Sequence, residues 1–236
     1  SFVTERSNGS WMESSQYDFG TLQLLFMGAD AVQTITGVDY FPEVTALRSQ
    51  YTYYDIFMST PNLNDAFKEG PNDLDQRNLG SSRRKPYANI LMTALREANS
   101  SLAPYLNDYQ DRMTDQPNWR DFIFGDPQSA LTNYRTGMGK SFVDTVSGLY
   151  AYHDNWNNTS SSAFFADVPR NSKVDHKKNH FATWDLYRGG AWAVTHVVSY
   201  DAENTANDQS IYLNTMLVGG LPVMQECRPV LATESQ

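Results

Sequence analysis

Two histidines set four residues apart have the types and spacing of a metal site. His176 and His180 would share one face of a helix, with Asp175 beside the first, and two imidazoles placed in this way suit one zinc ion. The segment lacks the HExxH pattern of zinc hydrolases, and its composition is that of a polar loop. We therefore expect surface histidines, no bound metal and no cofactor.

Other catalytic chemistry has little support in the residue patterns. Carboxylates are plentiful, but nothing in the sequence marks two of them as the pair that a glycosidase needs. No GxSxG elbow, GxGxxG motif or complete GxxxxGK[ST] loop occurs. Cys227 is the only cysteine and has no histidine near it in the sequence, so we expect a packed free thiol. The sequence predicts no catalytic residues and a protein that is not an enzyme.

Aromatic residues in loops suggest a different kind of site. A pyranose packs its C–H face on an aromatic ring while polar side chains pair with its hydroxyl groups. Loops carry binding residues more often than element interiors do, and most large aromatic residues elsewhere are expected to be buried. The sequence therefore predicts a glycan-binding platform built from Tyr40, Phe41, Trp119 and Trp184.

Composition limits the classes of protein to consider. The chain has 236 residues, of which 40% are hydrophobic and 13% aromatic, so it can bury a substantial core and is not a disordered chain. Its formal net charge of −9 argues against nucleic acid, which requires a clustered positive surface. No apolar run is long enough to span a membrane. The chain begins with Ser1 and shows no leader peptide, which is typical of a processed protein.

The elements that must position these residues are predicted to be mainly helical. Residues 21–32 are apolar enough for a buried helix broken near Gly28, and residues 84–99 carry an apolar stripe at helical spacing. Alternation over residues 191–200 predicts a half-buried strand. The whole chain, 1–236, is expected to form a single domain.

Residues 140–168 are predicted to form an antiparallel helical hairpin. Phe142, Val146 and Leu149 recur at helical spacing and are expected to face the core. The polar run HDNWNN would then turn the chain into a second helix carrying Ala and Phe. The predicted fold class is mainly α, with helical hairpins of tetratricopeptide type and a small strand-bearing segment near the C-terminus.

Several segments, in their order, resemble the SusD/RagB family of glycan-binding outer-membrane lipoproteins. They are QYDFG, GADAVQTITGVDYF, YTYYDIFMSTPNLND, NLGSSRRKPYANILMTALREA, the segment 140–168 and AWAVTHVVSYDAENT. Members of that family are longer and carry an N-terminal cysteine for a lipid anchor. The chain is thus expected to be an N-terminal portion, a processed form or a compact relative without that anchor.

The resemblance implies non-catalytic capture of glycans on the outward-facing surface of a bacterial outer membrane. It also implies delivery of the glycan to a TonB-dependent transporter. Two alternatives stay open at this point. One is a virus or phage capsid protein released by cleavage between Gln and Ser, and the other is a secreted glycoside hydrolase that uses two carboxylates.

Overall fold

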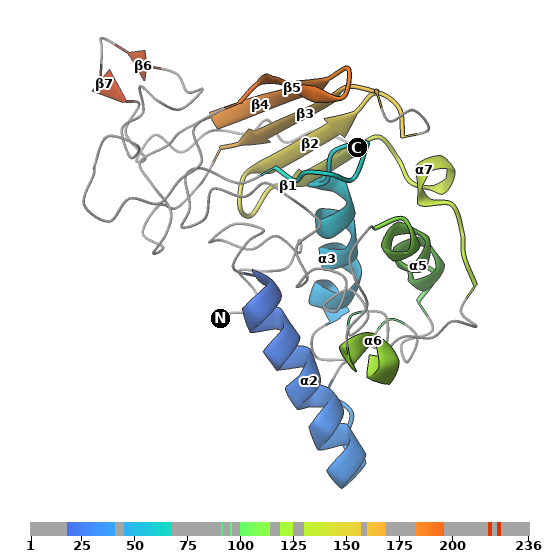
Figure 1. Cartoon of the computed structure of the whole chain (residues 1–236). Helices are drawn as coiled ribbons and strands as arrows, with labels where there is room; N and C mark the ends of the chain where they lie inside the picture. The colour runs from blue at the N-terminus through green and yellow to red at the C-terminus, as the bar shows by residue number, and fades with distance from the viewer. Residues whose placement is uncertain are drawn as a thin grey trace.

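A computed structural model places a set of helices against one face of an antiparallel sheet (Figure 1). The helices come first along the chain and the sheet follows. The structure describes residues 18–40, 45–67, 91, 95, 100–113, 119–124, 130–156, 160–168, 183–195, 217–218 and 221–222. Phe41, His176, His180 and Cys227 lie outside these described residues.

The sheet contains five antiparallel strands, each paired with the next one along the chain. These are β1 (Ser141–Asp144), β2 (Leu149–His153), β3 (Ala163–Asp167), β4 (Thr183–Arg188) and β5 (Ala191–Val194). Buried and exposed positions alternate along the strands, as they must when one face packs on a core. The turn between β4 and β5 contains Gly189 and Gly190, both with positive φ, which glycine adopts without steric cost.

The helical hairpin predicted for residues 140–168 is wrong, because β1, β2 and β3 occupy that segment. Phe142 and Leu149 are buried as predicted, but they lie on neighbouring strands of the sheet. Val146 lies in the turn between β1 and β2, where its amide N–H binds the Asp144 carboxylate. A spacing of four and three residues therefore matched a strand, a turn and a second strand.

The helical prediction fares better in the first half of the chain. Helix α2 (Asp18–Thr36) runs unbroken through Gly28, so the predicted break is absent, and α3 (Thr45–Phe57) follows it. Leu91 and Leu95 are helical and fully buried, which confirms the predicted stripe at these two positions. The remaining described helices are short: α5 (Ala103–Asp111), α6 (Trp119–Phe124) and α7 (Tyr134–Gly137).

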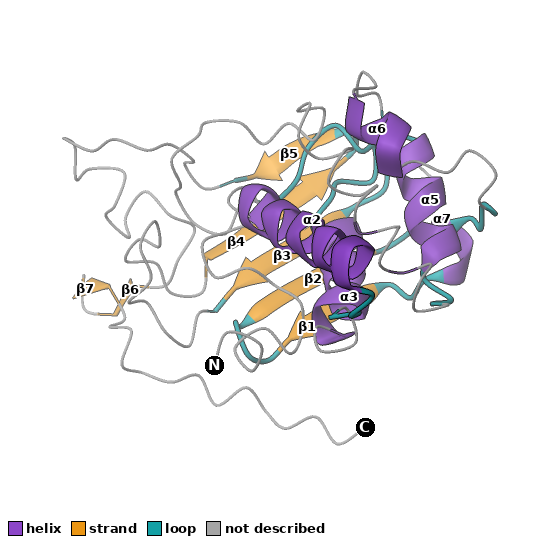
Figure 2. Cartoon of the chain, turned by 90° about the horizontal axis from the view of Figure 1, so that it is seen from below, coloured by secondary structure: helices purple, strands orange, loops and turns teal. Residues whose placement is uncertain are grey.

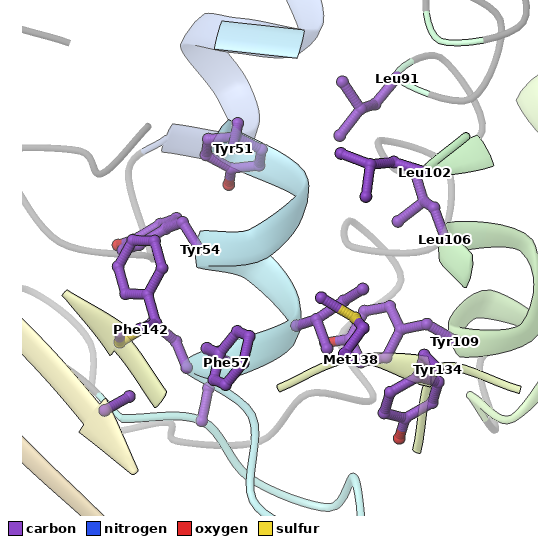
Figure 3. Close-up of a cluster of buried hydrophobic side chains, with 14 of the residues drawn as sticks. Tyr51, Tyr54, Phe57, Leu91, Leu102, Leu106, Tyr109, Tyr134, Met138 and Phe142 are labelled. Carbon is purple, nitrogen blue, oxygen red and sulfur yellow. The ribbon is translucent and has the colours of Figure 1, made fainter. Parts of the chain in front are cut away.

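The core lies between α3, α5 and the inner face of the sheet. Figure 3 shows Tyr54 and Phe57 of α3 beside Phe142 of β1, with residues of α5 on the other side of α3. The Phe57 and Phe142 rings stack with centroids 6.0 Å apart. Helix α3 is therefore the central element, and its aromatic residues join the helices to the sheet.

The predicted strand near the C-terminus is confirmed over residues 191–194. Trp192 and Val194 are half-buried in β5, while Ala191 and Ala193 are exposed. A two-stranded hairpin follows, made of β6 (Leu217–Val218) and β7 (Leu221–Pro222). Since strands account for most of the described chain after residue 140, the mainly α, tetratricopeptide-type fold class is wrong. No helix within the described residues is long and apolar enough to cross a membrane.

Candidate functional site at the acidic end of the sheet

The inward-facing side chains of the sheet have aromatic surroundings at one end and include buried carboxylates at the other. At the end next to α7 the row consists of His153, Ala163 and Tyr187, and aromatic rings surround it. We call this the aromatic end. The opposite end carries buried carboxylates and a buried hydroxyl group, and we call it the acidic end, defined by Asp144, Asp167, Thr183 and Asp185.

At the acidic end, the Asp144 side chain on β1 closes the turn between β1 and β2. Its Oδ1 accepts hydrogen bonds from the amides of Val146 and Ser147 at 2.8 and 3.1 Å. This pattern is the usual way in which an aspartate holds a turn. Asp144 therefore has a clear structural role, although it also adds a negative charge to this end of the sheet.

Asp167 and Asp185 lie on adjacent strands and have no comparable turn to hold. Asp167 of β3 is directly opposite Thr183 of β4 in the register, and Asp185 is the diagonal neighbour of Asp167 on the same face. Diagonal neighbours of this kind have Cβ atoms about 7–8 Å apart. Both carboxylates are completely buried, so burial disfavours their ionised forms unless they are paired.

The acidic end also carries the hydroxyl groups of Thr183 and Thr195. Thr195 approaches Asp185 at 3.4 Å between Oγ1 and Oδ2, which is long for a hydrogen bond. Thr183 is fully buried, and its Oγ1 has no hydrogen-bond partner among the described residues. A buried hydroxyl without a partner destabilises a fold by about 1–3 kcal/mol. This end of the sheet is therefore not arranged for maximum stability.

The aromatic end is packed around His153. Its ring stacks on Trp156 with centroids 3.7 Å apart, and the edges of Phe57 and Phe165 approach it. Nε2 lies 2.9 Å from the carbonyl oxygen of Phe57, so the neutral imidazole donates its proton there. Burial lowers the pKa of His153 to about 4, because the apolar surroundings disfavour the charged form. This histidine links α3 to the sheet.

Tyr187 lies at the same end, beside the loop that follows α3. Trp192 donates a hydrogen bond from Nε1 to Asp65 at 3.1 Å and packs edge-on against Tyr187. Burial, and then the charge on Asp65, raise the pKa of Tyr187, while Asn62 acts in the opposite direction. The phenol therefore stays protonated near neutral pH and lies beside a carboxylate and an amide.

The Asp108 carboxylate of α5 holds α7 in place at the aromatic end. Arg112 donates two hydrogen bonds to Asp108, both at 2.9 Å, and the backbone N–H of Tyr134 binds the same carboxylate at 3.2 Å. The hydrogen bonds to Asp108 are the main cause of a raised pKa for Arg112. Arg135 bridges the Tyr134 hydroxyl and the carbonyl oxygen of Pro61. These contacts pair Asp108 and Arg135, whereas His153 Nδ1 and the Tyr187 hydroxyl are buried at this end without a hydrogen-bond partner among the described residues.

The residues predicted to form a glycan-binding platform lie on separate parts of the molecule. Tyr40 is exposed just after α2, and Trp119 is 55% exposed at the start of α6. Trp184 lies on the outer face of the sheet, where it stacks on Phe164 at 6.1 Å. Helices α2 and α6 extend away from the sheet (Figure 1). These rings therefore belong to different elements, and glycan binding by any of them stays a prediction.

The acidic end could not be predicted from the sequence because helical spacing over residues 140–168 hides β1 and β3, which carry Asp144 and Asp167. In SFVD and AFFAD the aspartate follows two apolar residues, and in TWD it follows a tryptophan. An acidic residue at an inward-facing position of such a strand is unusual, since aspartate is depleted in strands and rarely fully buried. An aspartate after apolar residues at these positions was the signal in the sequence that pointed to a buried carboxylate.

The described residues contain no group of three His, Cys, Asp or Glu side chains arranged to hold a metal ion. The predicted pair His176 and His180 belongs to segment 169–182, which connects Asp167 to Thr183 in the sequence. That segment lies outside the described residues, so metal binding by the two histidines stays untested.

Comparison with solved structures shows which proteins share this fold. No family model matches the chain, and no curated protein matches it. The structure is similar to a crystal structure of heparinase III, with a TM-score of 0.59 and 14% identity over 94% of this chain. It is also similar to the heparinase III BT4657 gene product, with a TM-score of 0.58 and 13% identity over 94% of the chain.

A third similar structure is the heparan sulfate lyase HepC from Pedobacter heparinus, with a TM-score of 0.56 and 12% identity over 94% of this chain. The matched region makes up 35%, 32% and 33% of the three proteins, so this chain spans about a third of their length. At these identities the similarity establishes a shared fold. The shared fold also replaces the tetratricopeptide-type architecture expected from the SusD/RagB resemblance.

Proposed function

We propose that this chain acts on a polysaccharide and that the chemistry takes place at the acidic end of the sheet. The observation that carries the proposal is the buried pair Asp167 and Asp185, which lies in a fold shared with heparinases and a heparan sulfate lyase. Burial of two carboxylates in a small space is costly, and such costs concentrate at functional sites.

The reaction we propose is elimination from a polysaccharide that contains uronic acid. A base removes the proton from C5, next to the sugar carboxylate, the bond between C4 and the bridging oxygen breaks, and a C4=C5 double bond forms. The departing oxygen takes up a proton. The reaction therefore needs one group that accepts a proton and one that donates a proton.

Two neighbouring buried carboxyl groups suit that division of roles. Like charges close together in a buried site favour a state in which one group is ionised and the other is protonated. Asp167 and Asp185 are diagonal neighbours on one buried face of the sheet, and the Thr183 hydroxyl lies in the same row as Asp167. We propose that this pair holds in place the groups that contact the sugar and exchanges protons with them.

Non-catalytic capture of a glycan, the function predicted from the sequence, is the second candidate. It is favoured by the exposed aromatic rings of Tyr40, Trp119 and Trp184. The outward-facing bacterial surface and the TonB-dependent transporter stay predictions.

An assay of the purified chain on heparan sulfate separates the two candidates. The elimination proposal expects ultraviolet absorbance from the new double bond, together with new reducing ends. A neutral glucan, which cannot eliminate in this way, should give neither signal. Binding of heparan sulfate without product would favour capture, and the absence of both binding and product across polysaccharides that contain uronic acid would contradict both candidates.

A further inference from the structure

Trp192 of β5 lies half-buried beside a polar loop at the aromatic end of the sheet, which Figure 2 shows from below. Its Nε1 donates a hydrogen bond to Asp65 at 3.1 Å, a residue 127 positions away in the chain. Its ring packs on Tyr187 and Phe165, with centroids 5.4 and 5.8 Å away. The ring is therefore held in a fixed orientation while part of its surface stays open to solvent.

The loop that follows α3 carries three polar side chains within four residues. Asn62 and Asp65 are half-buried, and Asn64 is exposed. The backbone N–H and the hydroxyl of Thr60 both donate to the carbonyl oxygen of Asp65, at 2.8 and 2.9 Å. Leu63 within this turn has a φ of 58°, which a bulky residue rarely adopts. Such a conformation persists only where its surroundings fix it, so the loop presents these side chains from a rigid support.

The Tyr187 side chain lies beside the same loop and is completely buried. Its hydroxyl has no hydrogen-bond partner among the described residues. Asp65 and Asn62 both influence the pKa of this phenol, which places their side chains near it. A buried phenol normally has a partner, and a buried polar atom without one calls for an explanation such as a bound ligand or water. The cluster therefore contains a group that the contacts of the fold leave unsatisfied.

We propose that Trp192, Asn62, Asn64 and Asp65 form a binding site for an uncharged sugar residue. The pyranose packs its C–H face on the Trp192 ring. Its hydroxyl groups donate to the Asp65 carboxylate and pair with the two asparagine amides. The charge of Asp65 beside the ring disfavours a sugar carboxylate at this position. The fold thus brings together an aromatic ring and polar side chains from β5 and the loop after α3, which are far apart in the sequence.

This site lies at the opposite end of the sheet from Asp167 and Asp185, so it does not depend on the elimination proposed for that pair. It rests on the second candidate function, capture of a glycan, and gives that function a location and a class of ligand. An uncharged sugar residue can belong to a neutral glycan or lie between uronic acids in an acidic one. Both kinds of oligosaccharide are therefore needed as probes.

Isothermal titration calorimetry with cellohexaose, mannohexaose and a heparan sulfate hexasaccharide tests the proposal. The wild-type chain should bind at least one of them, and Trp192→Ala should raise the dissociation constant at least about tenfold. Trp192→Phe, which keeps a ring for stacking, should raise it less. Asn64→Ala changes an exposed position, so it should weaken binding about threefold with an unchanged unfolding midpoint. The matched control, Tyr152→Ala on the outer face of the sheet, removes a ring that is 39% exposed and should leave binding unchanged.

Three results would overturn the proposal. They are a wild-type chain that binds none of the three hexasaccharides at millimolar concentration, binding that Trp192→Ala and Asn64→Ala leave unchanged, and an equal loss in Tyr152→Ala. Circular dichroism checks that each variant folds, and Asn64→Ala decides the question if Trp192→Ala does not fold. Binding of the heparan sulfate hexasaccharide that survives Asn64→Ala but is lost in Asp167→Asn would place the glycan at the acidic end. That outcome would overturn this site and support the function proposed for the carboxylates.

Discussion

The aromatic end and the acidic end share one sheet face and one core, yet they bury polar groups in different ways. At the aromatic end, His153 is neutral, stacked on Trp156 and hydrogen-bonded to Phe57. At the acidic end, Asp167 and Asp185 are buried on neighbouring strands beside the unpartnered Thr183 hydroxyl. Both ends bury polar atoms without a hydrogen-bond partner among the described residues, His153 Nδ1 and the Tyr187 hydroxyl at one and the Thr183 hydroxyl at the other, but the strands of the acidic end also bury three carboxyl groups.

Under the function proposed above, stability and chemistry would be divided along the sheet. Aromatic rings at one end connect α3, α5 and α7 to the strands. Carboxyl groups at the other end lower the stability that this core could provide. Substitutions at the two ends should therefore affect different measured quantities.

Replacement of Trp156 by Ala should have the largest effect on stability. Its ring packs against His153, Phe57 and Tyr134, and its Nε1 donates a hydrogen bond to the carbonyl oxygen of Gly139. Loss of a buried tryptophan typically lowers the free energy of unfolding by about 3–5 kcal/mol. Urea unfolding measures this change. A loss below about 1 kcal/mol would show that the aromatic end does not hold the helices to the sheet.

Acid should destabilise the protein through His153. The pKa of this histidine is about 4 in the folded state, below its ordinary value of 6.5. The unfolded chain therefore binds a proton more readily, so this stabilisation is complete above pH 6.5 and is lost as the pH falls toward 4. The contribution is on the order of 3 kcal/mol.

Unfolding in urea at a series of pH values between 7 and 4 measures that loss. In His153→Phe, which keeps an aromatic ring, the slope of stability against pH over this range should be clearly smaller. An identical slope in the variant would assign the acid sensitivity to other groups.

Neutralisation of Asp185 should change stability little. Asp185→Asn keeps the shape of the side chain and removes one of the buried charges at the acidic end, so we expect a change within about 1 kcal/mol. Urea unfolding at pH 7 checks this. A loss of about 3–5 kcal/mol, as is typical of a broken buried ion pair, would make this carboxylate a structural group.

The smallest effect is expected at Trp184 on the outer face. The ring is 38% exposed and stacks on Phe164, so Trp184→Ala should lower the free energy of unfolding by about 1 kcal/mol. Titration with an oligosaccharide tests whether Trp184 also contributes to glycan binding. Weakened glycan binding would support the sugar-binding role predicted from the sequence, and unchanged binding would remove Trp184 from it.

The sequence predicted helices and strands correctly where apolar residues recurred with a single period, either helical or alternating. Leu91 and Leu95 are helical and buried, and Trp192 and Val194 alternate in a strand. The pattern failed at Phe142, Val146 and Leu149, where two strands and a turn reproduced helical spacing by coincidence. Burial in the sheet depends on pairing between segments far apart in the chain, which periodicity within one segment does not report.

The candidate site was harder to predict than the fold for the same reason. Asp167 and Asp185 are 18 positions apart, and only the pairing of β3 with β4 makes them neighbours. Carboxylates were recognised as plentiful in the sequence, but no local feature marked these two as a pair. The predicted aromatic platform draws on separate elements, since Tyr40 follows α2, Trp119 begins α6 and Trp184 lies on β4, and it stays a prediction.

The most direct test of a glycan-processing site at the acidic end compares Asp167→Asn with Asp154→Asn. Asp154 is exposed at the aromatic end, where its Oδ1 accepts a hydrogen bond from the backbone N–H of Ser162, so it is a matched control. The rate of formation of unsaturated product from heparan sulfate should fall at least tenfold in Asp167→Asn, with an unfolding midpoint close to wild type, and should be unchanged in Asp154→Asn. Full activity in Asp167→Asn, or an equal loss in both variants, would contradict the assignment of the chemistry to the acidic end.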